Sequence, residues 1–122
     1  MAKTPKQRTM PAAPARRSPC PVSCTLDFLG DRWSLLVVRD LFFGRSRFKD
    51  FLASPEKIPT NVLAERLQRL QSQKLVEQIA SPDGTKHKAY ALTPKGRSLL
   101  PIIKLLRDWG LQWIEGTEQG IK

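Results

Sequence analysis

Residues 58–75 form the stretch whose side-chain types and spacing are best suited to recognising another molecule. Leu63, Leu67 and Leu70 recur at helical spacing, which predicts an amphipathic helix with one apolar stripe. At about 100° per residue, the face opposite this stripe carries Asn61, Glu65, Gln68, Ser72 and, slightly to one side, Arg69. Amide, carboxylate and guanidinium groups on one helix face can form hydrogen bonds with base edges and phosphates.

The start of this helix is also suited to contact with an anion. Pro59 precedes Thr60, whose hydroxyl is expected to cap the first turn, so the positive end of the helix is exposed. An apolar stripe with a solvated polar face is, however, also what ordinary surface helices show. The segment alone leaves both interpretations open, and its neighbours help to decide between them.

The neighbouring segments predict a helix, a turn, the helix just described and then a hairpin. A short amphipathic helix is expected over residues 46–53, capped by Ser46, with its phenylalanines turned inward. A strand at 74–80, a Ser-Pro-Asp-Gly-Thr turn and a second strand at 89–92 follow the longer helix. This order predicts a mainly α fold with a small β-hairpin wing (α+β), the winged helix-turn-helix.

Basic side chains flank this unit. Arg45, Arg47 and Lys49 crowd the N-terminal end of the short helix, where a cation is disfavoured unless an anion lies nearby, and this placement favours phosphate contacts. Each of these three residues could equally be a solvated charge. Lys86 and Lys88 lie near the hairpin tip, and a basic tip suits a wing laid along the DNA backbone or in the minor groove.

The remaining segments predict further helices around one core. A short helix at about 21–29 is followed by a strongly apolar helix at 32–43, capped by Asp31, which must be central and buried. Thr93 is expected to cap a last helix over residues 94–114. These helices complete a domain in which the hairpin is the only predicted sheet.

The last helix is more apolar than one face of so small a domain can use. Pro101 is expected to be absorbed near its first turns, with at most a kink. The surplus apolar side chains favour a contact with the first helix of a second copy, and burial within the same chain is the alternative. The candidates for the subunit contact are Leu26, Leu99, Ile103, Leu106 and Trp113.

Length and charge limit the classes of function. The 122 residues suffice for one compact domain, placed at 20–116 between a disordered basic tail at 1–19 and a flexible C-terminus at 117–122. A net charge of +10 suits a polyanionic partner, either nucleic acid or an anionic membrane surface. No apolar run reaches the roughly 20 residues that cross a bilayer, and no signal peptide is recognisable. We therefore expect a cytoplasmic protein with no membrane partner.

The residue patterns that build metal and enzyme sites are not recognisable in this sequence. Cys20, Cys24 and His87 cannot supply a four-ligand zinc site, so no metal or cofactor is expected. A Gly-rich phosphate loop, a paired-carboxylate site and a nucleophile with its base are all missing, which indicates a protein that is not an enzyme.

Several motifs, taken in order and at their spacing, resemble those of one family. They are Cys20-Pro21, LDFLGDRWSLLVVRDL at 26–41, RFKDF at 47–51, IPTNVLAERLQRLQSQKLV at 58–76, YALTPKG at 90–96, and the pairs Leu100-Pro101 and Trp109-Gly110. Over about residues 20–116 the chain resembles the HxlR family of bacterial transcriptional regulators, winged-helix proteins related to the MarR group. The resemblance implies a homodimer joined through its first and last helices. It also implies double-stranded DNA as the partner, at an inverted repeat with half-sites roughly 34 to 36 Å apart.

The same resemblance implies roles for individual side chains. Base or backbone contacts would come from Thr60, Asn61, Glu65 and Arg66, phosphate contacts from Arg45, Arg47 and Lys49, and wing contacts from Lys86 and Lys88. Asn61 would pair with adenine, Glu65 with cytosine, and Arg69 with guanine or phosphate. By helical angle Arg66 lies nearer the core edge than Glu65, so a structural ion pair is its alternative role.

In several members of this family, a cysteine at the position of Cys20 senses thiol-reactive species. A thiol at a helix N-terminus with Arg16 and Arg17 just upstream favours the reactive thiolate. Cys24 departs from the family pattern and lies one turn further on the same face. Either thiol could form a bridge within or between subunits, and a packing role for Cys20 is the alternative.

These expectations converge on a sequence-specific DNA-binding regulator, a dimeric repressor that acts by steric block and responds to thiol oxidation or to a small molecule. Two alternatives belong to other classes. A protein that coats nucleic acid nonspecifically would lose affinity steeply with salt on any sequence. A winged-helix module for protein interaction would not need its basic flank, and its binding would persist at high salt.

Overall fold

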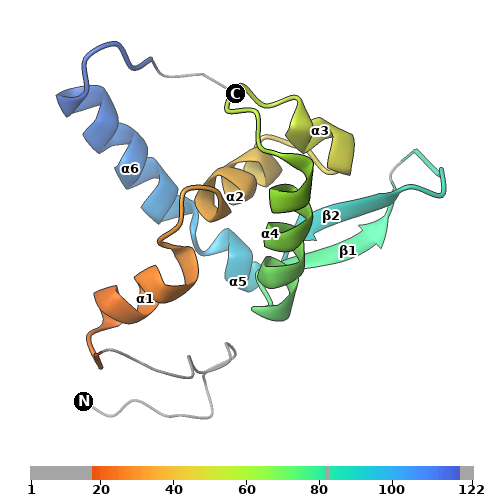
Figure 1. The fold of residues 1–122 in the computed structure, drawn as a ribbon, viewed down its shortest axis with the longest axis horizontal. Helices are drawn as coiled ribbons and strands as arrows, with labels where there is room; N and C mark the ends of the chain where they lie inside the picture. The colour runs from red at the N-terminus through yellow and green to blue at the C-terminus, as the bar shows by residue number, and fades with distance from the viewer. Residues whose placement is uncertain (1–17, 82, 119–122) are drawn as a thin grey trace.

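The chain adopts the predicted order of helices and hairpin in the computed structural model, which describes residues 18–81 and 83–118. The elements are α1 (Pro21–Leu29), α2 (Ser34–Phe42), α3 (Phe48–Leu52), α4 (Thr60–Ser72), β1 (Val76–Ala80), β2 (Lys88–Leu92), α5 (Pro94–Arg97) and α6 (Leu100–Trp113). Helices α1 and α6 project on the side away from the β1–β2 hairpin (Figure 1). The predicted fold class is confirmed. Residues 1–17 of the expected basic tail and 119–122 of the expected flexible terminus lie outside the described residues.

The apolar stripe of α4 is the centre of the core. Leu63, Leu67 and Leu70 are each at most 2% exposed, and they belong to one cluster with Val38 of α2 and Phe51 of α3. Burial of a leucine side chain contributes about 1.5–3 kcal/mol of hydrophobic free energy. Because this stripe faces the core, the opposite face of α4 is left toward solvent.

The apolar segment that the sequence placed at the centre is α2. Val37 and Val38 are 2% and 0% exposed, and Trp33 packs against the same core. The Ser34 amide donates to Asp31 Oδ1 at 3.0 Å, but the helix begins at Ser34 with Trp33 at its N-cap, so the prediction that Asp31 is the capping residue was wrong. The predicted burial of this helix is confirmed.

The hairpin is joined to the segment that precedes α3. Strands β1 and β2 pair antiparallel, and an isolated antiparallel bridge links Arg47 to Ala89 on the other edge of β2. The Tyr90 amide donates to the Ser46 carbonyl at 2.8 Å, and the Tyr90 ring meets Phe51 edge to face at 6.4 Å between centroids. Alternation in the sequence gave no sign of this extra pairing, which fixes the wing relative to α3.

Two further predicted helix caps are wrong. Pro59, not Thr60, occupies the N-cap of α4, and no side chain caps that end. Arg47, not Ser46, occupies the N-cap of α3, where the Asp50 carboxylate accepts the Arg47 amide at 3.0 Å. Helix α4 begins one residue too early for Thr60 to be its N-cap, and α3 begins one residue too late for Ser46 to be its N-cap.

The last helix was predicted to be continuous over residues 94–114, but the structure has two helices there. Thr93 caps α5 as expected, since its hydroxyl accepts the Gly96 amide at 3.0 Å. The chain then breaks at Ser98 and Leu99, and α6 begins with Pro101 in its first turn. Proline has no N–H to donate to the carbonyl four residues earlier and its ring crowds that carbonyl, so a new helix starts instead of a kink.

This break changes the set of residues available for a subunit contact. Leu99 is only 8% exposed and belongs to the protomer core, so its assignment to a subunit interface was wrong. Ile103 also packs against that core. Leu26, Leu106 and Trp113 are 55%, 55% and 66% exposed, as a subunit contact requires.

Candidate nucleic-acid interface

The exposed face of α4 carries the polar side chains that the sequence singled out. Thr60, Asn61, Glu65 and Gln68 are all exposed, and we call these four residues the reading face. The first amides of a helix have no acceptor within it, and no side chain caps this end of α4. The start of the helix therefore presents amide donors together with the Asn61 side chain.

Beside the reading face, two arginines of α4 share two carboxylates. Arg66 Nε donates to Asp31 Oδ2 at 2.6 Å and Arg66 Nη1 pairs with Glu65. Arg69 lies 3.2 Å from Glu65 and 3.7 Å from Asp31 in the same group. We call these four residues the Asp31 cluster. Arg66 thus has the structural ion pair that was its alternative role, while Arg69 is more loosely held.

Burial of the Asp31 carboxyl disfavours its charged form, but this effect is outweighed. Hydrogen bonds from the Ser34 hydroxyl and amide and from Arg66 favour the carboxylate. The net result is a pKa of Asp31 below its ordinary value. The desolvation of Arg66 is likewise outweighed by its two carboxylate partners, and the pKa of Arg66 is raised. Both groups are therefore charged at neutral pH.

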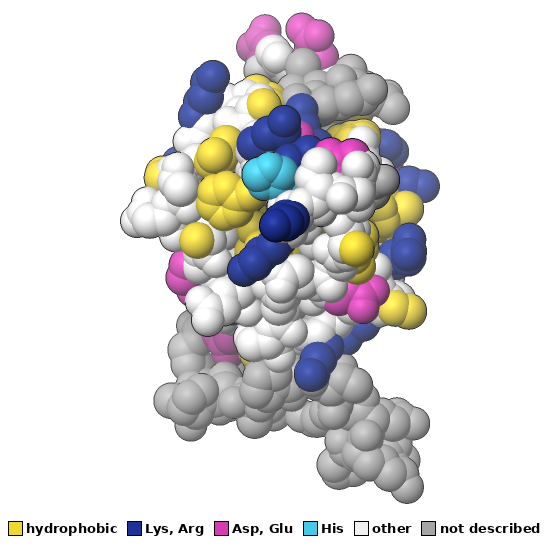
Figure 2. Space-filling view, turned by 90° about the vertical axis from the view of Figure 1, so that its right-hand side faces the viewer, with side chains coloured by type: hydrophobic (Ala, Val, Ile, Leu, Met, Phe, Trp, Pro, Cys, Tyr) yellow, Lys and Arg dark blue, Asp and Glu magenta, His cyan; other side chains and the backbone are white. Residues whose placement is uncertain are grey.

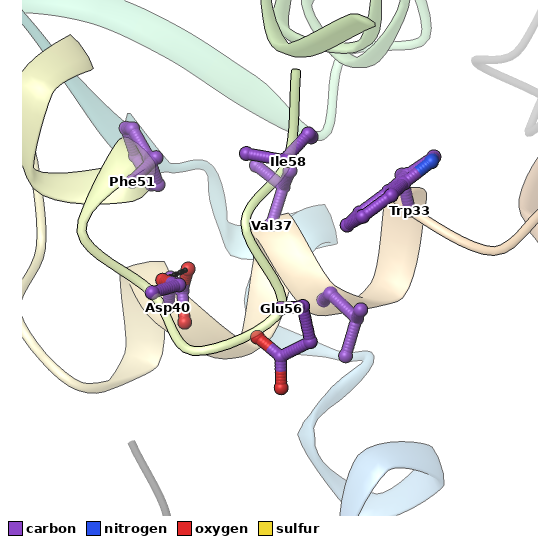
Figure 3. A pocket seen from close by; sticks show the side chains of 8 residues that line it. Trp33, Val37, Asp40, Phe51, Glu56 and Ile58 are labelled. Atoms are coloured by element: carbon purple, nitrogen blue, oxygen red, sulfur yellow. Dashed lines mark hydrogen bonds between the residues drawn. The ribbon is translucent and has the colours of Figure 1, made fainter. Parts of the chain in front are cut away.

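A second charge network holds the loop that leads into α4. The Asp40 carboxylate is 3% exposed and accepts hydrogen bonds from Arg39 at 2.8 Å, from Arg45 at 3.3 Å and from the Ser54 hydroxyl at 2.5 Å. Arg39 also forms a bidentate salt bridge with Glu56, with N–O distances of 2.8 and 2.9 Å. We call these five residues the Asp40 network. Asp40 and Glu56 line a small pocket with the apolar side chains of α2 and Ile58 (Figure 3).

The Asp40 network changes the interpretation of Arg45. Its guanidinium donates to the Ser54 hydroxyl at 2.8 Å and is half-buried, so this arginine fixes the turn between α3 and α4 instead of projecting toward a phosphate. The hydrogen bonds from Arg39 lower the pKa of Glu56 below its ordinary value, against the effect of burial. The network therefore joins four ionisable side chains and the Ser54 hydroxyl ahead of the reading face.

The wing carries exposed cations and one internal pair. Lys86 and Lys88 are exposed, and Lys and Arg side chains gather around the histidine on this side of the molecule (Figure 2). Arg47 Nη1 lies 2.7 Å from Asp83 in the wing turn. The Ser81 hydroxyl and the Thr85 amide also donate to Asp83 and hold the pKa of this carboxyl well below its usual range.

The predicted cations therefore fall into two groups. Lys49, Lys86 and Lys88 are exposed, whereas Arg45, Arg47 and Arg66 have carboxylate partners within the chain. The structure adds Lys57, which the sequence did not single out. Its exposed side chain stands in the turn before α4, with a left-handed backbone φ of 61°. No sequence signal marks this residue, because that conformation normally favours glycine or asparagine.

Comparison with known proteins identifies the family. Residues 28–118 match the HxlR-like helix-turn-helix family. The chain belongs to the HxlR family. The HTH-type transcriptional regulator YvaP of Bacillus subtilis is 33% identical over 90 residues, which are 74% of this chain and 83% of YvaP. YodB, a transcriptional regulator of the same bacterium, is 32% identical over 97 residues, which are 79% of this chain and 87% of YodB.

Solved structures of similar proteins share the fold. PA1607 superposes with a TM-score of 0.74 at 36% identity, over 85% of this chain and 72% of its own. Reduced YodB superposes with a TM-score of 0.65 at 31% identity, over 81% of this chain and 98% of its own. YodB has also been solved after diamide treatment and with quinone bound. The relatives of this HxlR chain are thus helix-turn-helix transcriptional regulators.

Both thiols of this HxlR-family chain lie at the start of α1. Cys20 is exposed at the N-cap and Cys24 is half-buried, and both are free. Cys24 Sγ lies 3.2 Å from the Ser18 carbonyl oxygen, and the Ser18 hydroxyl accepts the Cys20 amide at 3.0 Å. The exposed position leaves the Cys20 sulfur open to a soluble reagent.

The described part of the chain offers neither a metal site nor a membrane-spanning helix. Among residues 18–81 and 83–118, no group of three or more His, Cys, Asp or Glu side chains could hold a metal ion. In the same residues, every helix is too short or too polar to cross a membrane.

The charge networks predict how the free energy of unfolding depends on pH. Glu56 and Asp31 have lower pKa values in the folded chain than when unfolded, so the unfolded chain binds more protons in acid. Their contribution is complete above their unfolded pKa values of about 4 and is lost as the pH falls through the lower, folded values. Urea unfolding between about pH 7 and pH 3 should show this loss of stability.

Two variants make the pH dependence specific. Glu56→Gln removes one titrating carboxylate and should give a flatter profile, whereas Glu115→Gln, at an exposed position after α6, should keep the wild-type slope. Parallel profiles for wild type and Glu56→Gln would contradict the proposed role of the Arg39–Glu56 pair.

Proposed function

We propose that this HxlR-family protein is a sequence-specific DNA-binding regulator that represses transcription as a homodimer. The observation that carries the proposal is the reading face, since Thr60 and Asn61 stand exposed at the uncapped start of α4. The major groove of B-DNA is about 12 Å wide and admits one α-helix. With α4 in this groove, Asn61 can pair with adenine and Glu65 with cytosine.

The wing and α3 supply contacts to the DNA backbone in this arrangement. Lys86 and Lys88 would meet phosphates beside the groove, and Lys49 in the first turn of α3 would also meet the DNA backbone. Arg47 and Arg69 could join them, although each is also paired in the free protein, Arg47 with Asp83 and Arg69 with Glu65. These contacts set the position of α4, whereas the reading face sets the sequence.

Arginines that are paired with carboxylates of the same protomer favour sequence-specific DNA binding over nonspecific coating of nucleic acid. A protein that holds nucleic acid by charge alone gains from every exposed cation. Here Arg45 and Arg66 are used for ion pairs inside the protomer, and the reading face includes the acidic Glu65. The same basic wing argues against a module whose only partner is another protein.

We further propose that α1 and α6 join the two subunits. The exposed large apolar side chains of these helices are Val22, Leu26, Ile102, Leu105, Leu106, Trp109, Leu111 and Trp113. Apolar groups concentrated on two projecting helices are typical of an interface with a second copy. A two-fold dimer of this kind would bind an inverted repeat and would block transcription sterically.

The thiols of α1 could make this binding responsive to oxidation. YodB has been solved in reduced, diamide-treated and quinone-bound forms, and Cys20 of this chain is exposed on the helix proposed to form the dimer contact. Oxidation of Cys20 with Cys24, or with a cysteine of the second subunit, would remove two electrons and two protons and form a disulfide. A quinone or another small thiol-reactive molecule is the class of effector that this chemistry fits.

The function is tested by fluorescence anisotropy of the reduced protein with two duplexes. One duplex carries the DNA flanking the protein's own gene, and the other has the same bases scrambled. We expect at least about 10³-fold tighter binding to the first duplex. Asn61→Ala should reduce this preference by about tenfold or more, because a good base contact contributes about 1–3 kcal/mol of discrimination.

A lysine variant separates backbone contacts from base contacts. Lys86→Gln should weaken binding to both duplexes and reduce the salt slope by about one. Equal binding of the wild-type protein to both duplexes, together with an enriched-library search that finds no preferred sequence, would contradict the proposed function.

The dimer is tested by sedimentation equilibrium. Leu106→Glu places a carboxylate in the exposed apolar face of α6 and should raise the dissociation constant of the dimer by at least about 100-fold, because two leucine contacts are lost per dimer. Lys104→Glu introduces the same carboxylate on the opposite side of the helix and should leave the dimer intact. A monomeric wild-type protein at micromolar concentration would contradict the proposed assembly.

The thiol response is tested with diamide, which accepts the two electrons and two protons. Treatment should change the affinity for the preferred duplex by about tenfold or more and should be reversed by dithiothreitol. Cys20→Ser should abolish the response, and Cys24→Ser together with non-reducing gels should tell a bridge within one subunit from a bridge between subunits. Unchanged affinity and unchanged gel mobility after oxidation would contradict a sensing role.

A further inference from the structure

The corner between α1 and α2 touches the helix that carries the reading face. The Gly30 amide donates to the Leu26 carbonyl at 2.8 Å and closes α1. A Cβ atom at this position would lie 2.4 Å from that carbonyl oxygen, so the tight corner requires glycine. Asp31 follows immediately, which places its carboxylate between the end of α1, the start of α2 and the side of α4.

The Asp31 carboxylate is held by groups from two helices at once. Its Oδ1 accepts the Ser34 amide at 3.0 Å and its Oδ2 accepts the Ser34 hydroxyl at 2.9 Å. The same Oδ2 accepts Arg66 Nε at 2.6 Å. Ser34 is fully buried. The carboxylate is therefore hydrogen-bonded to the core through Ser34 and ion-paired with α4 through Arg66.

Arg66 already donates to two carboxylates within the protomer, Asp31 and Glu65. Its side chain is only 17% exposed, and Glu65 takes one of its remaining donors. Glu65 belongs to the reading face, so Arg66 connects Asp31 to a side chain expected at the base edges. Arg69 differs, because its side chain is 34% exposed and its nitrogens are 3.2 and 3.7 Å from the carboxylates.

We infer that Asp31 is a positioning residue for DNA recognition. Through Arg66 it fixes the rotation and placement of α4, and with them Glu65, so it controls discrimination between DNA sequences without touching DNA. The inference rests on the proposed function of the reading face. It also assigns a route from α1, which carries the thiols and the exposed apolar side chains, to α4, because only Gly30 separates the last residue of α1 from Asp31.

The first test compares Asp31→Asn with the wild-type protein on the preferred and scrambled duplexes. Asparagine keeps the size of the side chain, and its side-chain oxygen can still accept the Ser34 amide. It removes the negative charge that pairs with Arg66. Binding to the preferred duplex should fall by about tenfold, and binding to the scrambled duplex should be unchanged or slightly tighter. Glu115→Gln makes the same change of net charge at an exposed position remote from α4 in sequence and should leave the preference unchanged.

Arg66→Gln provides the second test, with salt dependence as the readout. Loss of a phosphate contact would reduce the salt slope by about 0.9, whereas loss of a positioning residue should lower the preference with the slope unchanged. The double variant Asp31→Asn/Arg66→Gln should lose no more preference than either single variant. Circular dichroism establishes that each variant is folded, and Arg66→Gln carries the test if Asp31→Asn is not.

The possible results separate this inference from the proposed function. A wild-type protein that prefers no sequence overturns both. A wild-type preference that persists in Asp31→Asn and Arg66→Gln overturns the inference alone. An equal gain in affinity for both duplexes in Asp31→Asn, or a smaller salt slope in Arg66→Gln, also overturns it, because these results indicate simple repulsion or a direct phosphate contact.

Discussion

Burial of the leucine stripe of α4 is the constraint on which the rest of this structure depends. Leu63, Leu67 and Leu70 lie in the centre of the core, and burial of each contributes about 1.5–3 kcal/mol. A helix with one face committed to the core must present the other face to solvent. The exposure of Thr60 and Asn61 is therefore a consequence of packing, and the helix cannot rotate to hide them without exposing leucines.

In addition to packing, two groups of charged side chains hold α4 and the loop that leads into it. The Asp40 network holds the loop before the helix, and the Asp31 cluster holds its side. Asp40 is buried, and removal of one partner from a buried ion pair is strongly destabilising, so the Asp40 network resists displacement. The arginines serve this purpose because a guanidinium can join two acceptors in a fixed geometry. Their cost is that fewer cations remain for DNA.

The sequence predicted the features that depend on local pattern. Leucine spacing predicted α4, turn chemistry predicted the hairpin, and the apolar run predicted the buried α2. The bridge from Arg47 to β2 and the Arg45–Ser54 hydrogen bond were missed, because helical periodicity says which face a residue occupies but not which distant group it meets. Leu99 was misplaced because the predicted helix ran through the position where Pro101 forces a new start.

The most direct test of the central claim, that α4 reads a DNA sequence from a two-fold dimer, is selection of duplexes from a random library by the reduced full-length protein. We expect enrichment of an inverted repeat whose half-sites lie about one helical turn, roughly 34–36 Å, apart. A library that remains random after repeated rounds at physiological salt would contradict it, since charge would then be sufficient to explain all binding. An enriched single half-site would retain α4 as the reading element but contradict the dimer.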